Sequence, residues 1–95
     1  MAQAIVFNAL RDMGVTAPRT RSAIKALVVD LYLNEEGTSE RVIESEDDAT
    51  FAVWYALTLA AHSPAQATML RDAGFTVSDS FAQVRTPNGD WLEGD

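Results

Sequence analysis

The stretch "ATFAVWYALTLAAH", residues 49–62, decides the fold predicted for this chain. It contains no Asp, Glu, Lys or Arg, although the five residues before it read "ESEDD" (44–48). Its length favours a helix over a strand, and apolar side chains occupy almost the whole circumference of that helix. Such a helix is normally central, so we predict that the other elements pack around it. The candidates for its N-cap are Ser45, Asp47 and Asp48.

The side chains of this helix differ in size from one side to another. The small side chains recur on one face, at Ala49, Ala52, Ala56 and Ala60. The large ones cover the rest of the circumference, at Phe51, Val53, Trp54, Tyr55, Leu57 and Leu59. The alanine face lets a neighbouring helix approach closely, whereas the large side chains need more cover than a thin core provides.

Two further helices are predicted before this one. Residues 3–13 carry an apolar face and end at Gly14, a suitable C-cap. Residues 20–35 carry apolar side chains on two opposite sides, at 24/27/28/31 and at 26/29/33, and Gly37 follows as a second candidate C-cap. The run "ALVVDLYL" is also compatible with a strand, but the length and the flanking caps favour a helix.

A fourth helix is predicted over residues 64–73. In "SPAQ" (63–66), Ser63 is a candidate N-cap, Pro64 suits the first helical position, and Gln66 completes a capping box. Gly74 is placed to end this helix. The sequence "LRDAGFT" (70–76) echoes "LRDMGVT" (10–16), which indicates either an old duplication or two helices that end in the same way.

The C-terminal residues predict a β-hairpin. Asn88-Gly89 suits a tight turn between strands at 81–86 and 90–93, and residues 41–44 are a candidate third strand. The fold class is therefore α+β: about four short helices followed by a C-terminal hairpin, in one domain over residues 1–95. A winged-helix-like arrangement and a mostly α fold are the alternatives.

Composition bounds the environment and the chemistry of the chain. The 95 residues carry a net charge of −7 and contain no cysteine, which excludes disulfides and thiol chemistry. No stretch reaches the roughly 18 apolar residues that a membrane span needs, and the N-terminus lacks the features of a signal peptide. We expect a cytoplasmic protein with no membrane partner and no cofactor.

Residues 35–48 hold seven acids against Arg41 alone. Three interpretations of these acids are open: a solvated, helix-capping surface; a surface that binds a basic protein or mimics nucleic acid; and a cation site or catalytic carboxylate pair. Their spacing does not match a calcium-binding loop.

The apolar surface points to association with another chain. A domain of this size buries only about 60–65% of its unfolded surface, which is little cover for two helices with apolar side chains on several sides. We therefore predict a homodimer or a protein target with a basic patch, against a monomer that covers everything itself. The predicted partner-binding residues are Glu35, Glu36, Glu40, Glu44, Glu46, Asp47, Asp48, Val29, Tyr32, Leu33 and Trp54.

The function that follows is a small, non-enzymatic protein-interaction module. A short acidic chain without motifs looks like many phage or mobile-element accessory proteins, which suggests that it binds and inhibits or modulates a host protein. The alternative is a helix-turn-helix or winged-helix-like regulator using Arg19, Arg21 and Lys25, although an acidic chain makes a nucleic-acid partner unfavourable. A third hypothesis is a small enzyme that uses His62, the only histidine.

Overall fold

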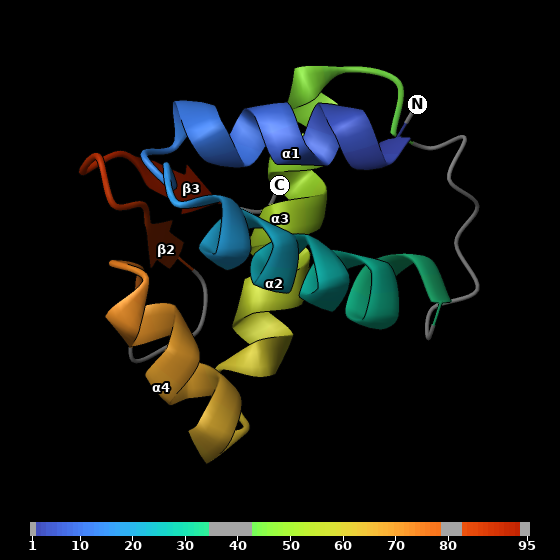
Figure 1. The fold of residues 1–95 in the computed structure, drawn as a ribbon. Coiled ribbons are helices and arrows are strands. Elements are labelled where there is room, and N and C mark those ends of the chain that lie inside the picture. The colour runs from blue at the N-terminus through green and yellow to red at the C-terminus, as the bar shows by residue number, and fades with distance from the viewer. Residues whose placement is uncertain (1, 35–42, 79–82, 94–95) are drawn as a thin grey trace.

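The computed structural model describes residues 2–34, 43–78 and 83–93 (Figure 1). Four α-helices are followed by a three-stranded antiparallel sheet, which confirms the predicted α+β class. The helices are α1 (Ala2–Asp12), α2 (Pro18–Val28), α3 (Glu46–Ala60) and α4 (Pro64–Asp72). A π-helix, η1 (Val29–Asn34), follows α2 directly. The strands are β1 (Thr76–Val77), β2 (Gln83–Arg85) and β3 (Trp91–Glu93).

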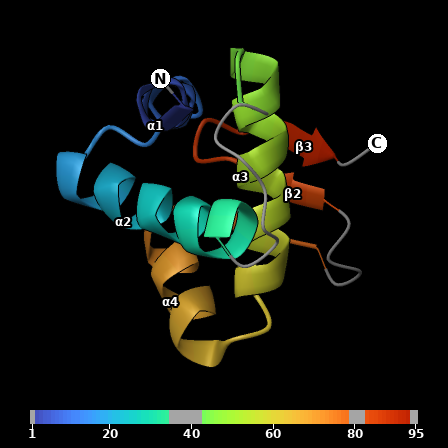
Figure 2. The ribbon, with the colours of Figure 1, turned by 90° about the vertical axis from the view of Figure 1, so that its right-hand side faces the viewer.

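Helix α3 is central, as its composition predicts. In Figure 1 it passes behind α1 and α2, and Figure 2 shows α1 and α2 on one side of it and the β2–β3 hairpin on the other. The four alanines of its small face are completely buried, together with Val53 and Leu57. Because alanine has a single methyl group, this face lets α1 and α2 approach the backbone of α3 closely. The core therefore forms around the small side of α3.

The predicted second helix changes its geometry halfway along. Residues 18–28 are α-helical, and the backbone then continues as the wider π-helix η1. The π-helix has i→i+5 hydrogen bonds and is rare in proteins, where it often accompanies functional sites. Val29, Leu31 and Tyr32 of this segment pack against the core, and the Tyr32 ring contacts that of Phe51 on α3.

The N-terminus of α3 is held by a capping box. The Asp48 N–H donates to Ser45 Oγ at 3.2 Å, and the Ser45 N–H donates to Asp48 Oδ2 at 3.2 Å. This confirms Ser45 as the N-cap. The capping box predicted for α4 is wrong, because Ser63 occupies the N-cap position without a side-chain capping bond. The Ser63 N–H already donates to the carbonyl of Ala60 at 3.0 Å, so it is not available to Gln66.

The hairpin lies where the Asn-Gly turn predicts it. The strand that completes the sheet comes from a different part of the chain than expected. Arg85 pairs with Trp91 and Val84 with Leu92, and the sheet order is β1-β2-β3. The third strand is Thr76–Val77, not 41–44. Residues 41 and 42 lie outside the described part of the chain, and Ile43 and Glu44 are not in a strand. The Glu44 N–H instead donates to Asp48 Oδ2 at 3.1 Å, so this backbone is used to cap α3.

The two echoed sequences end α1 and α4 in the same conformation. Gly14 and Gly74 have φ values of +103° and +98°, which glycine adopts without strain. Val15 N–H donates to the Leu10 carbonyl and Phe75 N–H to the Leu70 carbonyl, both at 3.0 Å, as in a Schellman motif. A shared way of ending a helix is therefore sufficient to explain the echo.

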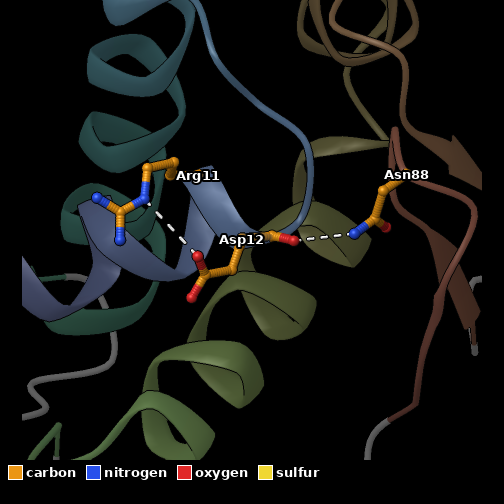
Figure 3. Close-up of polar contacts among 3 residues, drawn as sticks. All are labelled: Arg11, Asp12 and Asn88. Atoms are coloured by element: carbon orange, nitrogen blue, oxygen red, sulfur yellow. Dashed lines mark hydrogen bonds and ion pairs between the residues drawn. The ribbon is translucent and has the colours of Figure 1, made fainter.

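The hairpin turn packs against both helix ends. A Cβ atom at either glycine would lie 3.2–3.3 Å from Pro87 Cβ, so Pro87 fits between the two helix termini. Asn88 Nδ2 donates to the Asp12 carbonyl at 2.8 Å (Figure 3), and the Asn88 N–H donates to the Met13 carbonyl at 3.0 Å. The turn thus satisfies carbonyls that the end of α1 leaves free and fixes the sheet to the helices.

Candidate functional site

The side of α3 that faces away from the core carries its aromatic residues. We define the outer face of α3 as Asp47, Phe51, Trp54, Tyr55, Thr58, Leu59 and His62. A helix turns about 100° per residue, so Phe51 and Thr58 lie roughly opposite the buried alanines. Phe51 and Leu59 are each 39% exposed. Two large apolar side chains of α3 are therefore directed outward, whereas all four alanines are directed into the core.

Four rings form a connected aromatic cluster on and beside this face. The ring centroid of Tyr32, from η1, lies 5.3 Å from that of Tyr55 and 6.1 Å from that of Phe51, in edge-to-face geometry. Phe51 and Trp54 have centroids 5.5 Å apart. Such contacts stabilise ring pairs by about 0.5–1.5 kcal/mol beyond area burial. The rings therefore stabilise one another's positions on this face.

The predicted apolar binding residues are only partly covered. Val29, Tyr32 and Trp54 are each half-buried and pack against the core. Leu33 lies in η1 by its backbone, and its side chain is outside what the structure describes. The structure thus places Tyr32 and Trp54 in one cluster, with part of their surface accessible.

The described acids lie at the N-terminal end of α3, and of these only Asp47 belongs to the outer face. Glu44, Glu46 and Asp47 are exposed, whereas Asp48 is half-buried and forms the capping box. Asp48 therefore has a structural role, and Asp47 lies one helical turn before Phe51. The predicted Glu35, Glu36 and Glu40 lie outside the described residues.

Glu46 faces α1 and not the aromatic cluster. A side-chain hydrogen bond with Asp12, and the repulsion between the two carboxylates, raise the pKa of Glu46 above its usual 4.5. Two carboxyl groups can share a hydrogen bond only when one of them holds a proton, which explains the direction. Arg11, whose Nε lies 3.7 Å from Asp12 Oδ1 (Figure 3), opposes this shift.

The sequence prediction missed Phe51, Tyr55 and Leu59 as site residues. The signal was present in the alanine spacing. Once Ala49, Ala52, Ala56 and Ala60 are assigned to the core, position 51 must point away from it. Of the large side chains of this helix, only Trp54 was predicted to bind a partner, whereas Phe51 and Leu59 are the ones that the structure leaves 39% exposed.

The basic residues of α2 lie against an aromatic ring. The Arg21 guanidinium is 4.2 Å from the Phe7 ring centroid, and Lys25 Nζ is 5.8 Å from it. Cation–π contacts of this kind hold the side chains down on the helix surface. Arg19 is exposed. On α4, the helix that would read DNA in a winged-helix arrangement, Arg71 donates to Thr68 Oγ1 at 3.4 Å.

His62 is exposed just beyond the end of α3. A cavity of about 290 Å³ lies between the end of α3, α4 and β1, and its lining includes Ala61, Leu70, Arg71 and Phe75 but not His62. Among residues 2–34, 43–78 and 83–93, no three His, Asp or Glu side chains are grouped to hold a metal ion. We take the outer face of α3 as the candidate site, because the exposed Phe51 and Leu59 and the half-buried Trp54 and Tyr55 lie on it.

Comparisons of the chain with protein-family models, with curated proteins and with solved structures find no match. Within the part of the chain that the structure describes, no helix is long and apolar enough to cross a membrane.

Proposed function

We propose that the protein is a non-enzymatic interaction module that binds another protein through the outer face of α3. One observation carries this proposal: Phe51 of the central helix is 39% exposed in a cluster with the half-buried Trp54 and Tyr55, while the alanines of the same helix fill the core. Aromatic side chains that are already held in place lose little entropy on binding, and Trp and Tyr are enriched among the residues that dominate interface energies.

The acids beside the aromatic cluster support a partner with a basic patch. Glu44 and Asp47 are exposed at one end of the outer face, and Phe51, one turn from Asp47, is 39% exposed. Opposite charges at the rim of an interface increase the association rate and set the orientation, while buried rings supply most of the affinity. Inhibition or modulation of a host protein by a small accessory protein is the setting that we propose.

The direct test is site-specific photo-crosslinking. Phe51 is replaced by a photoreactive phenylalanine analogue, which keeps a ring at this position. Thr16, an exposed residue of the α1–α2 connection, is the control site. We expect one dominant protein adduct from position 51 and none of that protein from position 16. Equal adducts from both sites, or none from position 51, would reject the proposal.

The charge of the partner is tested with the identified adduct. The variant with Glu35, Glu36, Glu40, Glu44 and Glu46 changed to Gln should bind more weakly and with a flatter salt dependence. The matched control changes Asp72 and Asp90 to Asn, two exposed acids on α4 and the hairpin turn. Unchanged affinity in the glutamine variant would reject the acidic recognition and leave the aromatic contact in place. A second copy of the chain is a further candidate partner for the same face.

A further inference from the structure

We infer that the outer face of α3 pairs with the same face of a second copy, with the two helices antiparallel and the twofold axis between Trp54 and Tyr55. This inference rests on the proposed function, because it names the chain that covers the aromatic cluster. The reasons are the spacing of the outer residues, their sizes and the distribution of charge along the helix.

The spacing is that of a helix-packing seam. Asp47, Phe51, Trp54 and Thr58 follow one another at intervals of four, three and four residues, with His62 four residues further on. Alternating intervals of three and four keep side chains on one stripe that can face a partner helix. The stripe extends from the N-terminal turn of α3 to just beyond its end, about 22 Å at 1.5 Å per residue. A second helix of equal length can therefore lie along it.

The sizes along the seam match when one helix is reversed. A twofold axis between residues 54 and 55 brings Phe51 opposite Thr58 of the second copy, so a large side chain faces a small one at two equivalent places. The Thr58 hydroxyl donates to the carbonyl of Tyr55 at 2.8 Å within its own helix, so its hydrogen bond is already made. Its methyl group can then contact the Phe51 ring without leaving a buried donor unsatisfied.

Charge distribution selects the antiparallel orientation. In a parallel pair, the exposed Glu44 and Asp47 of both copies would meet at one end, where like charges repel. In the antiparallel pair the acidic ends lie at opposite ends of the seam, and Asp47 faces His62 of the second copy. The helix dipoles also oppose each other favourably in this orientation. Glu44 of each copy stays at the outer ends, where it remains accessible to a basic partner.

The pair is expected to be weak and reversible. One helix face with Tyr32 and Leu59 beside it is smaller than the roughly 800 Å² per partner of a stable complex. A covalent trap is therefore the suitable test, and the absence of cysteine in the chain makes single introduced thiols unambiguous.

The experiment mixes two full-length variants, Asp47→Cys and His62→Cys, under mild oxidation and measures disulfide-linked dimer on a non-reducing gel. Both positions are exposed, and each mixed dimer keeps one native Asp47–His62 contact at its other end. We expect the mixed 47–62 dimer to exceed the mixed 16–62 dimer, made with Thr16→Cys as control, at least about tenfold, because pairing raises the effective concentration of the two thiols. Each variant alone should give only the control level.

Other patterns overturn the inference. Strong dimer formation by Asp47→Cys alone and by His62→Cys alone would show a parallel pair, and a mixed product at the control level would show that this pairing does not occur. A product that persists when Phe51→Ala is added to both variants would show that the seam does not drive pairing. The proposed function fails separately: a monomer that still crosslinks a different protein from position 51 rejects only the self-pairing.

Discussion

The two faces of α3 differ in the size and in the exposure of their side chains. The inner face is built from completely buried alanines with Val53 and Leu57, and the outer face carries Phe51 and Leu59, each 39% exposed. A size-based expectation would bury the larger side chains first, because they gain more from leaving water. The four buried alanines indicate that close helix approach shaped this part of the core, so that Phe51 and Leu59 keep part of their surface accessible.

The largest effect is expected from a matched pair of leucines on the two faces. Leu57 is completely buried and Leu59 is 39% exposed, on the same helix. Leu57→Ala should lower the free energy of unfolding by about 2–5 kcal/mol, because it leaves a cavity. Leu59→Ala should cost less than about 1 kcal/mol. Urea denaturation of both variants measures this, and equal losses would contradict the assignment of the two faces.

Enlarging the small face should have the next largest effect. Ala56 is completely buried, and no room for a larger side chain is expected where helices pack against it. Ala56→Leu should destabilise the fold by about 1–3 kcal/mol through overpacking. Ala26→Leu, at an exposed position of α2, is the control and should be close to neutral. Thermal unfolding of the two variants compares them, and a neutral Ala56→Leu would show that the inner face is loosely packed.

Removing the N-cap of α3 should have a moderate effect. Ser45 Oγ accepts from the Asp48 N–H, so Ser45→Ala should cost about 1 kcal/mol. Ser63 occupies the same position on α4 but has no side-chain capping bond, so Ser63→Ala should change stability by no more than a few tenths of a kcal/mol. Chemical denaturation distinguishes them. A larger loss at Ser63 than at Ser45 would reverse the assignment of the two caps.

The smallest effect concerns Glu46, where α3 meets α1. The pKa of its carboxyl is raised in the folded state, so the native protein holds more proton than the unfolded chain between pH 4.5 and the folded pKa. The contribution of the protonated Glu46 carboxyl to the free energy of unfolding is present in full below pH 4.5 and is lost as the pH rises through the folded pKa. Glu46→Gln removes the repulsion from Asp12, so the variant should be more stable than the natural protein at neutral pH.

The measurement is the difference in melting temperature between the Glu46→Gln variant and the natural protein across this pH range. The difference should shrink as the pH falls below 4.5. Asp47→Asn, at an exposed neighbour, is the control. A constant difference at all pH values would mean that Glu46 and Asp12 do not interact in the folded protein.

Prediction from sequence succeeded where the signal is local. The Ser45 cap, the glycines at 14 and 74 and the Asn88-Gly89 turn each depend on a few adjacent residues, and all are found as predicted. It failed where a local signal competed with an unseen neighbour. Ser63 and Gln66 match the sequence pattern of a capping box. However, the backbone N–H of Ser63 donates to the Ala60 carbonyl in the turn after α3 and is not available to Gln66.

The candidate site was predicted in part for a related reason. Tyr32 and Trp54 were selected from composition, and the structure places both rings in one cluster with Phe51. Phe51 was not selected, because the sequence does not show how far neighbouring elements cover each side of an apolar helix. The burial of a side chain depends on which neighbouring element covers it. The spacing of residues within a helix shows which of them share a face, but not which face is covered.

The amino-acid sequence by itself determined the number and order of the α-helices, the Ser45 cap of α3, the glycine ends of α1 and α4, the hairpin turn and the contrast in size between the sides of α3. Local backbone preferences and hydrogen bonds between near neighbours suffice for these features. Only the tertiary structure decided that the alanine side faces inward, that Thr76–Val77 completes the sheet, that Pro87 fits between two helix ends and that Tyr32 reaches the rings of α3. These depend on contacts between residues far apart in the chain, whose energies arise only when the whole core forms together.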